Sequence, residues 1–307
     1  MAGDLMTGCV SEAVQTPSGE VFVQRGGSGP AVLLLHGFPE TSRMWHSIAP
    51  LLATNFTIVA ADLPGYGRSG YPPDEPGHAA MSKRSLARTF VAVMRELGQE
   101  TFAVIGHDRG ARVAYRAALD HPEVVEAVAV LDIVPTGEVW DRADARLALA
   151  FWPFSLLAQA APLPEQLIAG SPEAVVDNAL SQWGSSPTTF PDWLREDYVE
   201  TLRDPNRVHA ICEEYRAAAT IDREHDRLDR EAGRRIACPL LCLWSEEGAV
   251  GQWYKDDGGP LKLWRTLATN VSGQAMCGGH FFPEEHPRET ARLLREFLNG
   301  ALAAVFA

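Results

Sequence analysis

The feature that most constrains the fold is a set of short, nearly all-apolar runs that recur between helix-like stretches. The runs are residues 31–35, 57–61, 101–105 and 124–131. Runs of this length without polar alternation are typical of strands buried on both faces of a sheet. The stretches with helical character between them are residues 43–53, 82–97 and 111–119. This alternation predicts an α/β fold with a mostly parallel central sheet and helices on both faces.

The alternation stops between about residue 135 and residue 231. This region reads as helical segments interrupted by seven prolines, and the β-α pattern resumes at residues 239–244. The start of the chain, by contrast, predicts an antiparallel hairpin from two β-type runs around a Pro-Ser-Gly turn. We therefore expect one core domain formed by residues 1–134 and 232–307, with a helical cap domain, residues 135–231, inserted between two sheet strands.

Composition excludes several classes of function. The 307 residues carry 27 basic and 40 acidic side chains, a formal charge of −13, which argues against nucleic-acid binding. No apolar run reaches the roughly 18 residues that a membrane-spanning helix needs. Five cysteines without CxxC spacing indicate reduced thiols and a cytoplasmic protein. No metal-ligand spacing or phosphate-binding loop occurs, so neither a metal nor a cofactor is expected.

A candidate nucleophile lies where the third apolar run meets the following helix. Gly106-His107-Asp108-Arg109-Gly110 has the G-x-nucleophile-x-G spacing of a sharp strand-to-helix turn, in which the central side chain projects alone at the end of the sheet. By motif alone, a glycine-containing loop with a helix-capping Asp108 is an equally good interpretation.

Two other segments favour catalysis. His36-Gly37-Phe38-Pro39 follows an earlier buried strand, at the place where hydrolases of this architecture donate a backbone N–H to an oxyanion hole. We predict that Phe38 belongs to this loop and that the N–H of Arg109 is the second donor. His280 follows the last strand-like run, as a general base would in this chain order, although an isolated histidine is more often structural.

These segments resemble the α/β-hydrolase superfamily and, within it, the fluoroacetate and haloacetate dehalogenases. The matching segments are residues 36–41, 106–116, 131–133 and 212–216. The resemblance implies that Asp132 orients His280. The common superfamily position for this acid follows a later strand, where Glu246 and Glu247 lie, so that alternative stays open.

Chemistry explains an aspartate at the elbow. A serine that displaced a leaving group from a saturated carbon would form an ether, which water does not readily cleave. A carboxylate forms an ester, whose carbonyl water can attack with support from the oxyanion hole. Asp108 therefore favours electrophiles such as alkyl halides or epoxides, and we expect His280 to deprotonate the attacking water.

Arg109 and Arg112 are three positions apart in the first turn of the expected helix, where cations oppose the helix dipole. An anion opposite them would offset this cost, and arginine grips carboxylates well. Pairing with Asp108 or a structural acid is the alternative. The resemblance implies that both arginines hold the substrate carboxylate and that Tyr215 stabilises the departing halide.

The sequence departs from the family at the halide site. Pro153 and Phe154 stand where the family has a His-Trp pair that donates hydrogen bonds to fluoride. We therefore expect a haloacetate dehalogenase of short 2-haloacids that releases chloride or bromide rather than fluoride. Trp152 could turn its N–H into the gap, although a pocket wall is the simpler role for it.

Two other functions compete with this expectation. An epoxide hydrolase would use the same Asp108 and His280, with Tyr198 and Tyr215 as acids, but would give the two arginines no task. A non-catalytic ligand receptor with a hydrolase fold is the second alternative. The expected partners are a small anionic haloacid and water, and the resemblance suggests a homodimer.

Overall fold

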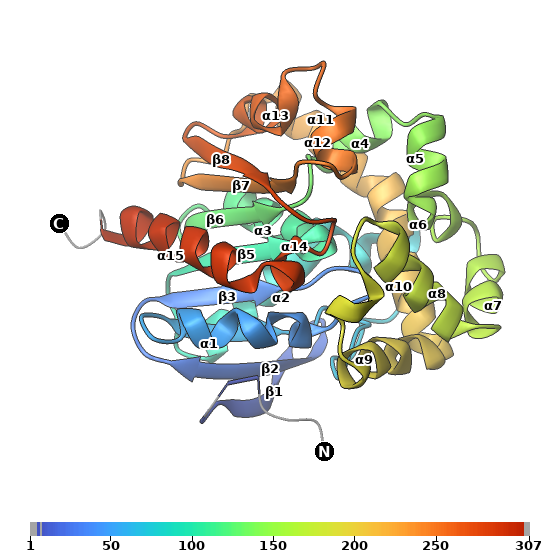
Figure 1. Ribbon diagram of the computed structural model, residues 1–307, viewed down its shortest axis with the longest axis horizontal. Coiled ribbons are helices and arrows are strands. Elements are labelled where there is room, and N and C mark those ends of the chain that lie inside the picture. The colour runs from blue at the N-terminus through green and yellow to red at the C-terminus, as the bar shows by residue number, and fades with distance from the viewer. Residues whose placement is uncertain (1–4, 7, 304–307) are drawn as a thin grey trace.

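The computed structural model describes residues 5–6 and 8–303, and an eight-stranded sheet forms its centre (Figure 1). The strands are β1 (Val10–Thr16), β2 (Gly19–Gly27), β3 (Ala31–Leu35), β4 (Thr57–Ala61), β5 (Phe102–His107), β6 (Val125–Leu131), β7 (Leu240–Ser245) and β8 (Val271–Met276). Their order across the sheet is β1-β2-β4-β3-β5-β6-β7-β8. Strands β3 to β8 are parallel to one another. The pairs β1–β2 and β2–β4 are antiparallel. The α/β-hydrolase fold class and the opening hairpin are confirmed.

Helices cover both faces of the sheet. Those outside the region between β6 and β7 are η1 (Ser42–Ser47), α1 (Ala49–Leu52), η2 (Pro76–Met81), α2 (Lys83–Glu96), α3 (Asp108–Asp120), α12 (Ala249–Trp253), α13 (Gly259–Leu267), α14 (Phe282–Glu285) and α15 (Pro287–Ala303). Figure 1 shows α1 and α15 on one face and α2 and α3 on the other. The helix expected at residues 43–53 is instead two short helices, η1 and α1, and Pro50 lies in the first turn of the second.

The region between β6 and β7 contains helices without strands among its described residues. These are α4 (Thr136–Asp141), α5 (Ala145–Ala150), α6 (Trp152–Leu156), α7 (Leu163–Ala169), α8 (Pro172–Gln182), η3 (Pro187–Thr189), α9 (Asp192–Arg203), α10 (Pro205–Ala219) and α11 (Ile221–Glu231). We call residues 136–231 the helical segment. Its helices lie together beside one edge of the core (Figure 1).

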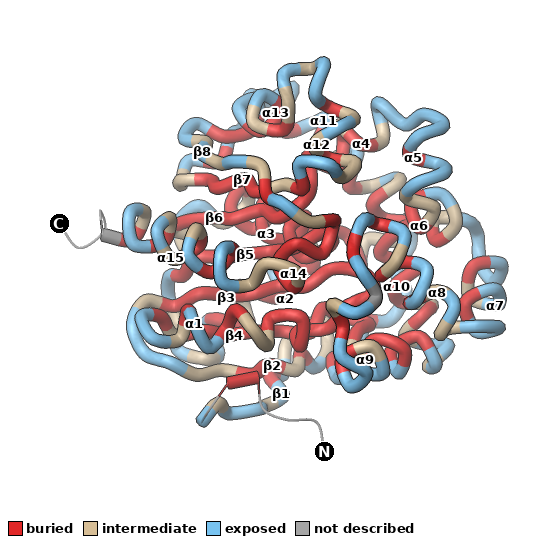
Figure 2. The backbone as a smooth tube through the Cα atoms, viewed as in Figure 1, coloured by how far each residue is buried: buried red, intermediate tan, exposed pale blue. Residues whose placement is uncertain are grey.

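The core follows from the strand sequences. Every residue of β3 and β5 is buried, and β6 is buried except at Glu126, as expected for strands covered on both faces. The buried trace in Figure 2 runs along these three strands and continues into α3. Within the described part of the chain, no helix combines the length and apolar character needed to cross a lipid bilayer.

Candidate active site

The turn between β5 and α3 has the backbone of a nucleophile elbow. Asp108 adopts a φ of 41°, a left-handed conformation that is uncommon for residues other than glycine. A Cβ on Gly106 would lie 2.4 Å from the nitrogen of Ala111, and one on Gly110 would lie 2.4 Å from the carbonyl oxygen of His36. Only glycine fits at either position, so the spacing seen in the sequence reflects close backbone packing around Asp108.

The carboxylate of Asp108 is buried and held from one side by the loop after β3. The N–H of Phe38 donates to Asp108 Oδ2 at 3.1 Å. Burial alone would raise the pKa of Asp108, but the nearby charges of His280, Arg109 and Arg112 outweigh it and lower that pKa below its ordinary value. The group is therefore held as an anion, the form that acts as a nucleophile.

The N–H of Arg109 suits the second donor position. Arg109 is the second residue of α3, and the first four N–H groups of a helix have no partner within it. The donor from Phe38 is thus observed, and the N–H of Arg109 as the second donor of an oxyanion hole stays a prediction.

His280 lies beside this carboxylate with a fixed ring orientation. Its Nδ1 lies 2.6 Å from Asp132 Oδ2, and because a carboxylate only accepts, Nδ1 carries the proton. The other oxygen of Asp132 accepts the N–H of Ser245 at 2.8 Å. Glu246 and Glu247, the alternative partners, are exposed. His280 Nε2 is buried and has no hydrogen-bond partner among the described residues, so it is available to accept a proton.

A small inner chamber lies between these groups and the helical segment, and residues of both line it. Its volume is about 30 Å³, comparable to the space that one or two waters need. It is lined by Asp108, Arg112, Asp132, Ile133, Val134, Val139, Leu147, Phe151, Phe154, Ala249, Val250, Trp253, Tyr254 and His280.

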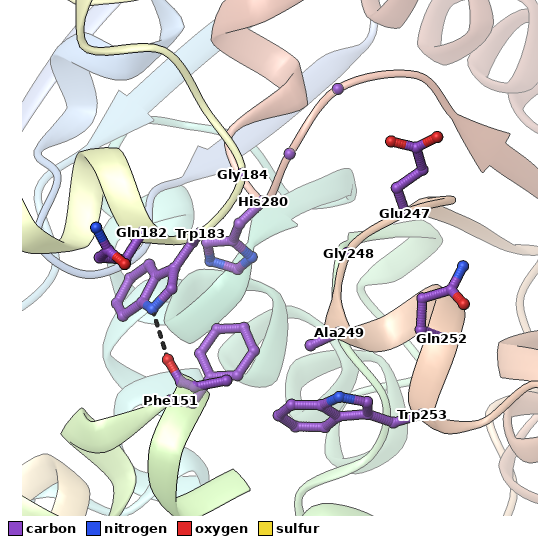
Figure 3. A pocket seen from close by; sticks show the side chains of 13 residues that line it. Phe151, Gln182, Trp183, Gly184, Glu247, Gly248, Ala249, Gln252, Trp253 and His280 are labelled. Atoms are coloured by element: carbon purple, nitrogen blue, oxygen red, sulfur yellow. Dashed lines mark hydrogen bonds between the residues drawn. The ribbon is translucent and has the colours of Figure 1, made fainter. Parts of the chain in front are cut away.

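A larger outer cavity of about 530 Å³ adjoins the chamber. Four residues line both spaces: Phe151, Ala249, Trp253 and His280. Figure 3 shows the rings of Trp183, His280, Phe151 and Trp253 around this cavity, and the Phe151 and Trp253 rings meet edge to face with their centres 5.5 Å apart. These aromatic residues of the mouth had no sequence signal, because nothing in their spacing connects Phe151 before α6, Trp183 after α8 and Trp253 at the end of α12.

The two arginines of α3 differ in their partners. Arg109 is fully buried, and its Nε and Nη2 donate to the carboxylate of Glu214 at 2.7 Å each. Arg112 donates from Nη1 to the carbonyl oxygen of Val134 and to Thr136 Oγ1, both at 3.1 Å. Each guanidinium keeps one buried nitrogen without a partner in the described structure, Nη1 of Arg109 and Nε of Arg112. Arg109 therefore pairs with a structural acid, Glu214, as the alternative interpretation expected, and its role toward a substrate carboxylate stays a prediction.

Phe154 lines the chamber and lies beside both arginines, whereas Tyr215 and Arg109 are not among the residues that line it. The guanidinium carbon of Arg109 lies 3.9 Å from the centre of the Tyr215 ring and 5.6 Å from that of Phe154, and that of Arg112 lies 5.4 Å from Phe154. Phe154 therefore brings an apolar ring, and no donor, to the place where the family has a tryptophan. The idea that Trp152 fills this gap is wrong, because its indole N–H donates to Asn178 Oδ1 at the surface.

A buried polar network behind the site was missed by the sequence analysis. The Nδ1 atom of His107 lies 2.9 Å from Glu40 Oε2. Its Nε2 atom donates to the carbonyl oxygen of His280 at 2.9 Å. Burial lowers the pKa of His107, but the carboxylate of Glu40 outweighs it and raises that pKa to about 9. Glu40 also accepts the N–H of Gly37. The network therefore ties the loop before Phe38 to the loop that carries His280.

Tyr198 forms a buried hydrogen bond away from the chamber and does not line it. Its hydroxyl donates to Glu284 Oε1 at 2.9 Å, and its side chain is fully buried. Tyr215 is thus the remaining one of the two tyrosines proposed as epoxide acids. Among the described residues, no group of three or more His, Cys, Asp or Glu side chains is arranged to hold a metal ion.

Comparisons with known proteins agree with this geometry. Residues 30–255 match the family model of the alpha/beta hydrolase fold. A fluoroacetate dehalogenase from Burkholderia sp is 42% identical over 91% of this chain and 90% of its own length. A soluble epoxide hydrolase from Corynebacterium sp. (strain C12) is 30% identical over 85% and 87%. The crystal structure of ALR0039 from Nostoc sp PCC 7120 superposes with a TM-score of 0.91 at 46% identity, covering 95% of this chain and 98% of the other.

Proposed function

Because the chain belongs to the α/β-hydrolase fold family and, within it, to the fluoroacetate and haloacetate dehalogenases, we propose that it is a haloacetate dehalogenase acting on short 2-haloacids. The observation that carries the proposal is the pair of buried, unpartnered guanidinium nitrogens, Arg109 Nη1 and Arg112 Nε. The two guanidinium carbons lie 5.6 and 5.4 Å from the centre of the Phe154 ring, and both charges act on the ionised Asp108. Buried donors without partners are costly, and a substrate carboxylate would satisfy both.

The first chemical step is a displacement at the α-carbon. With the substrate carboxylate held by Arg109 and Arg112, an oxygen of Asp108 attacks the carbon that bears the halogen. The carbon–halogen bond breaks, the halide leaves with the bonding electrons, and an ester joins Asp108 to the acid. Tyr215 stabilises the departing halide from the helical segment, which we propose acts as a cap over the chamber.

The second step hydrolyses this ester. His280 Nε2 removes a proton from water, and the resulting hydroxide attacks the carbonyl carbon of Asp108. The N–H groups of Phe38 and Arg109 stabilise the oxyanion of the tetrahedral intermediate. The bond between that carbon and the ester oxygen then breaks, and the proton on His280 Nε2 passes to that oxygen to give the 2-hydroxyacid. Asp108 is restored with one oxygen from water, and the second proton of that water leaves to solvent. Asp132 holds the imidazole and stabilises its charged form.

Halide release from chloro-, bromo- and fluoroacetate tests the proposal. We expect chloride and bromide release to exceed fluoride release, because Phe154 offers no donor to the leaving group. Asp108→Asn should abolish release of all three. Turnover in oxygen-18 water should label Asp108, which separates an enzyme from a ligand receptor. Halide release that continues unimpaired in Asp108→Asn, without deamidation, would refute the proposed nucleophile.

An epoxide hydrolase has weaker support from the site. The Corynebacterium relative is a soluble epoxide hydrolase, and both activities would use the same nucleophile and base. An epoxide carries no carboxylate, however, so it would leave Arg109 Nη1 and Arg112 Nε unsatisfied. Styrene oxide assayed beside chloroacetate would compare the two directly.

A further inference from the structure

A buried lysine lies behind the arginine pair and has no place in the chemistry described so far. Lys83 is the first residue of α2, and 1% of its surface is exposed. Its Nζ forms ion pairs with Glu214 Oε1 and, at 3.5 Å, with Asp222 Oδ2. Its backbone N–H donates to Asp222 Oδ1 at 2.9 Å. Lysine is rarely buried this completely unless it is paired, so its position needs an explanation.

Glu214 connects this lysine to Arg109. The carboxylate of Glu214, 2% exposed, accepts from Nε and Nη2 of Arg109 and also faces Lys83 Nζ. These contacts occupy one edge of the guanidinium plane, and Nη1 lies on the other edge without a partner among the described residues. Because the paired donors of the fork hold the plane rigidly, the direction in which Nη1 points is set by Glu214.

A carboxylate alone would be a poor support for an arginine that must attract an anion. In a buried site, the charge of Glu214 would cancel much of the charge of Arg109. Lys83 supplies a second cation on the same carboxylate, so Arg109 is not the only cation that Glu214 balances; with Asp222, the other partner of Lys83 at 3.5 Å, the four charges are neutral in sum. Burial lowers the pKa of Lys83, while the carboxylates of Glu214 and Asp222 counter that shift.

We propose that Lys83 and Glu214 are positioning residues for substrate recognition: Glu214 aims Arg109 Nη1 at the substrate carboxylate, and Lys83 balances the charge of Glu214 so that Arg109 remains an effective cation. This inference rests on the proposed function, since it assigns a carboxylate to the free edge of Arg109. None of Lys83, Glu214 and Arg109 is among the residues that line the inner chamber, but Arg109 lies next to two that do, Asp108 and Phe154, so we assign the effect of Lys83 and Glu214 to Arg109.

The charge role is tested with Lys83→Met, assayed with chloroacetate and titrated with acetate, an unreactive carboxylate. Losing a buried cation near the binding site should raise KM and the Kd for acetate about tenfold, with a much smaller change in kcat. Lys83→Arg should restore most of the affinity. Lys83→Gln, which keeps a hydrogen-bond donor, provides a second neutral variant in case Lys83→Met does not fold. Unchanged acetate binding in a folded neutral variant would overturn the charge role.

The aiming role is tested with Glu214→Gln. Removing this negative charge should strengthen anion binding if charge alone matters, whereas losing the fixed fork should weaken it. We expect weaker binding, with KM and the Kd for acetate raised; tighter binding would overturn the aiming role. The matched control is Glu213→Gln on the same helix, because Glu213 is also buried and paired but faces Arg216 and His78. Its acetate affinity should equal that of the unchanged protein.

Acetate binding separates this inference from the proposed reaction. If the unchanged protein releases no halide but binds acetate, and Lys83→Met weakens that binding, the proposed function fails while the positioning role stands. If the protein releases halide and the Lys83 and Glu214 variants bind acetate as before, the positioning role fails alone.

Discussion

Replacing Asp132 with asparagine should separate the two chemical steps proposed for this protein. Asp132 Oδ1 accepts the N–H of Ser245 at 2.8 Å, so an asparagine would keep its carbonyl oxygen there and turn its NH₂ group toward His280. Nδ1 would then have to accept, and the proton would move to Nε2. His280 would present a proton where the mechanism needs a base. The φ of 55° at this position also suits asparagine, so the backbone should not change.

The expected loss falls on ester hydrolysis. In serine proteases, the equivalent change reverses the histidine tautomer and lowers kcat about 10⁴-fold, roughly 5 kcal/mol of transition-state stabilisation. We expect a loss of about 10³- to 10⁴-fold here for the step that needs His280 as a base. Attack by Asp108 on the α-carbon needs no base, so it should be slowed far less.

Rapid-quench chloride release and intact-protein mass measurement check this prediction. Asp132→Asn should release one chloride per active site from chloroacetate and then accumulate protein that is heavier by one carboxymethyl group. Glu246→Gln is the matched control, because Glu246 is the exposed acid at the alternative position and should keep its turnover. Steady turnover without an adduct in Asp132→Asn, or a larger loss in Glu246→Gln, would refute the assignment of Asp132.

Three predictions concern stability. Burial lowers the pKa of His107, but Glu40 raises it to about 9, above its ordinary value of 6.5. The stability that this pair adds to the folded protein is therefore complete below pH 6.5 and is lost as the pH rises through 9. The shift corresponds to at most about 3 kcal/mol, and a urea midpoint that does not fall over this range would contradict it. Gly110→Ala should destabilise by several kcal/mol or prevent folding, roughly the upper end for buried overpacking, because its Cβ would meet the backbone. Gly300→Ala, whose Cβ would meet open space, should add about 0.5–1 kcal/mol of stability in a thermal melt.

The parts of the site that could be predicted from the sequence are those set by strand ends. Asp108, Asp132 and His280 follow β5, β6 and β8, and parallel strands finish at the same edge of a sheet. Their meeting therefore follows from chain order once the apolar runs are read as strands. The choice between Asp132 and the later glutamates needed coordinates, because both positions follow neighbouring strands and only the side-chain geometry distinguishes them.

The supporting contacts could not be predicted, because they join long side chains from distant elements. Glu214 lies 105 positions after Arg109, on a helix whose placement depends on the packing of the whole helical segment. No period or motif relates them, and a glutamate beside Tyr215 looks in the sequence like any helical acid. The same holds for Lys83, which reads as a surface lysine at a helix start and is instead buried.

These contacts explain how a buried nucleophile can stay both ionised and free to react. Asp108 needs positive charge nearby to remain an anion at low exposure, yet a direct ion pair with an arginine would compete with its attack on the substrate. The fold gives each arginine acceptors of its own: Glu214 for Arg109, and the Val134 carbonyl and Thr136 hydroxyl for Arg112. Burial raises the pKa of Asp108, and His280 together with these two cations, held in fixed positions, lowers it. In the proposed function, the nitrogens that remain unpartnered bind the substrate.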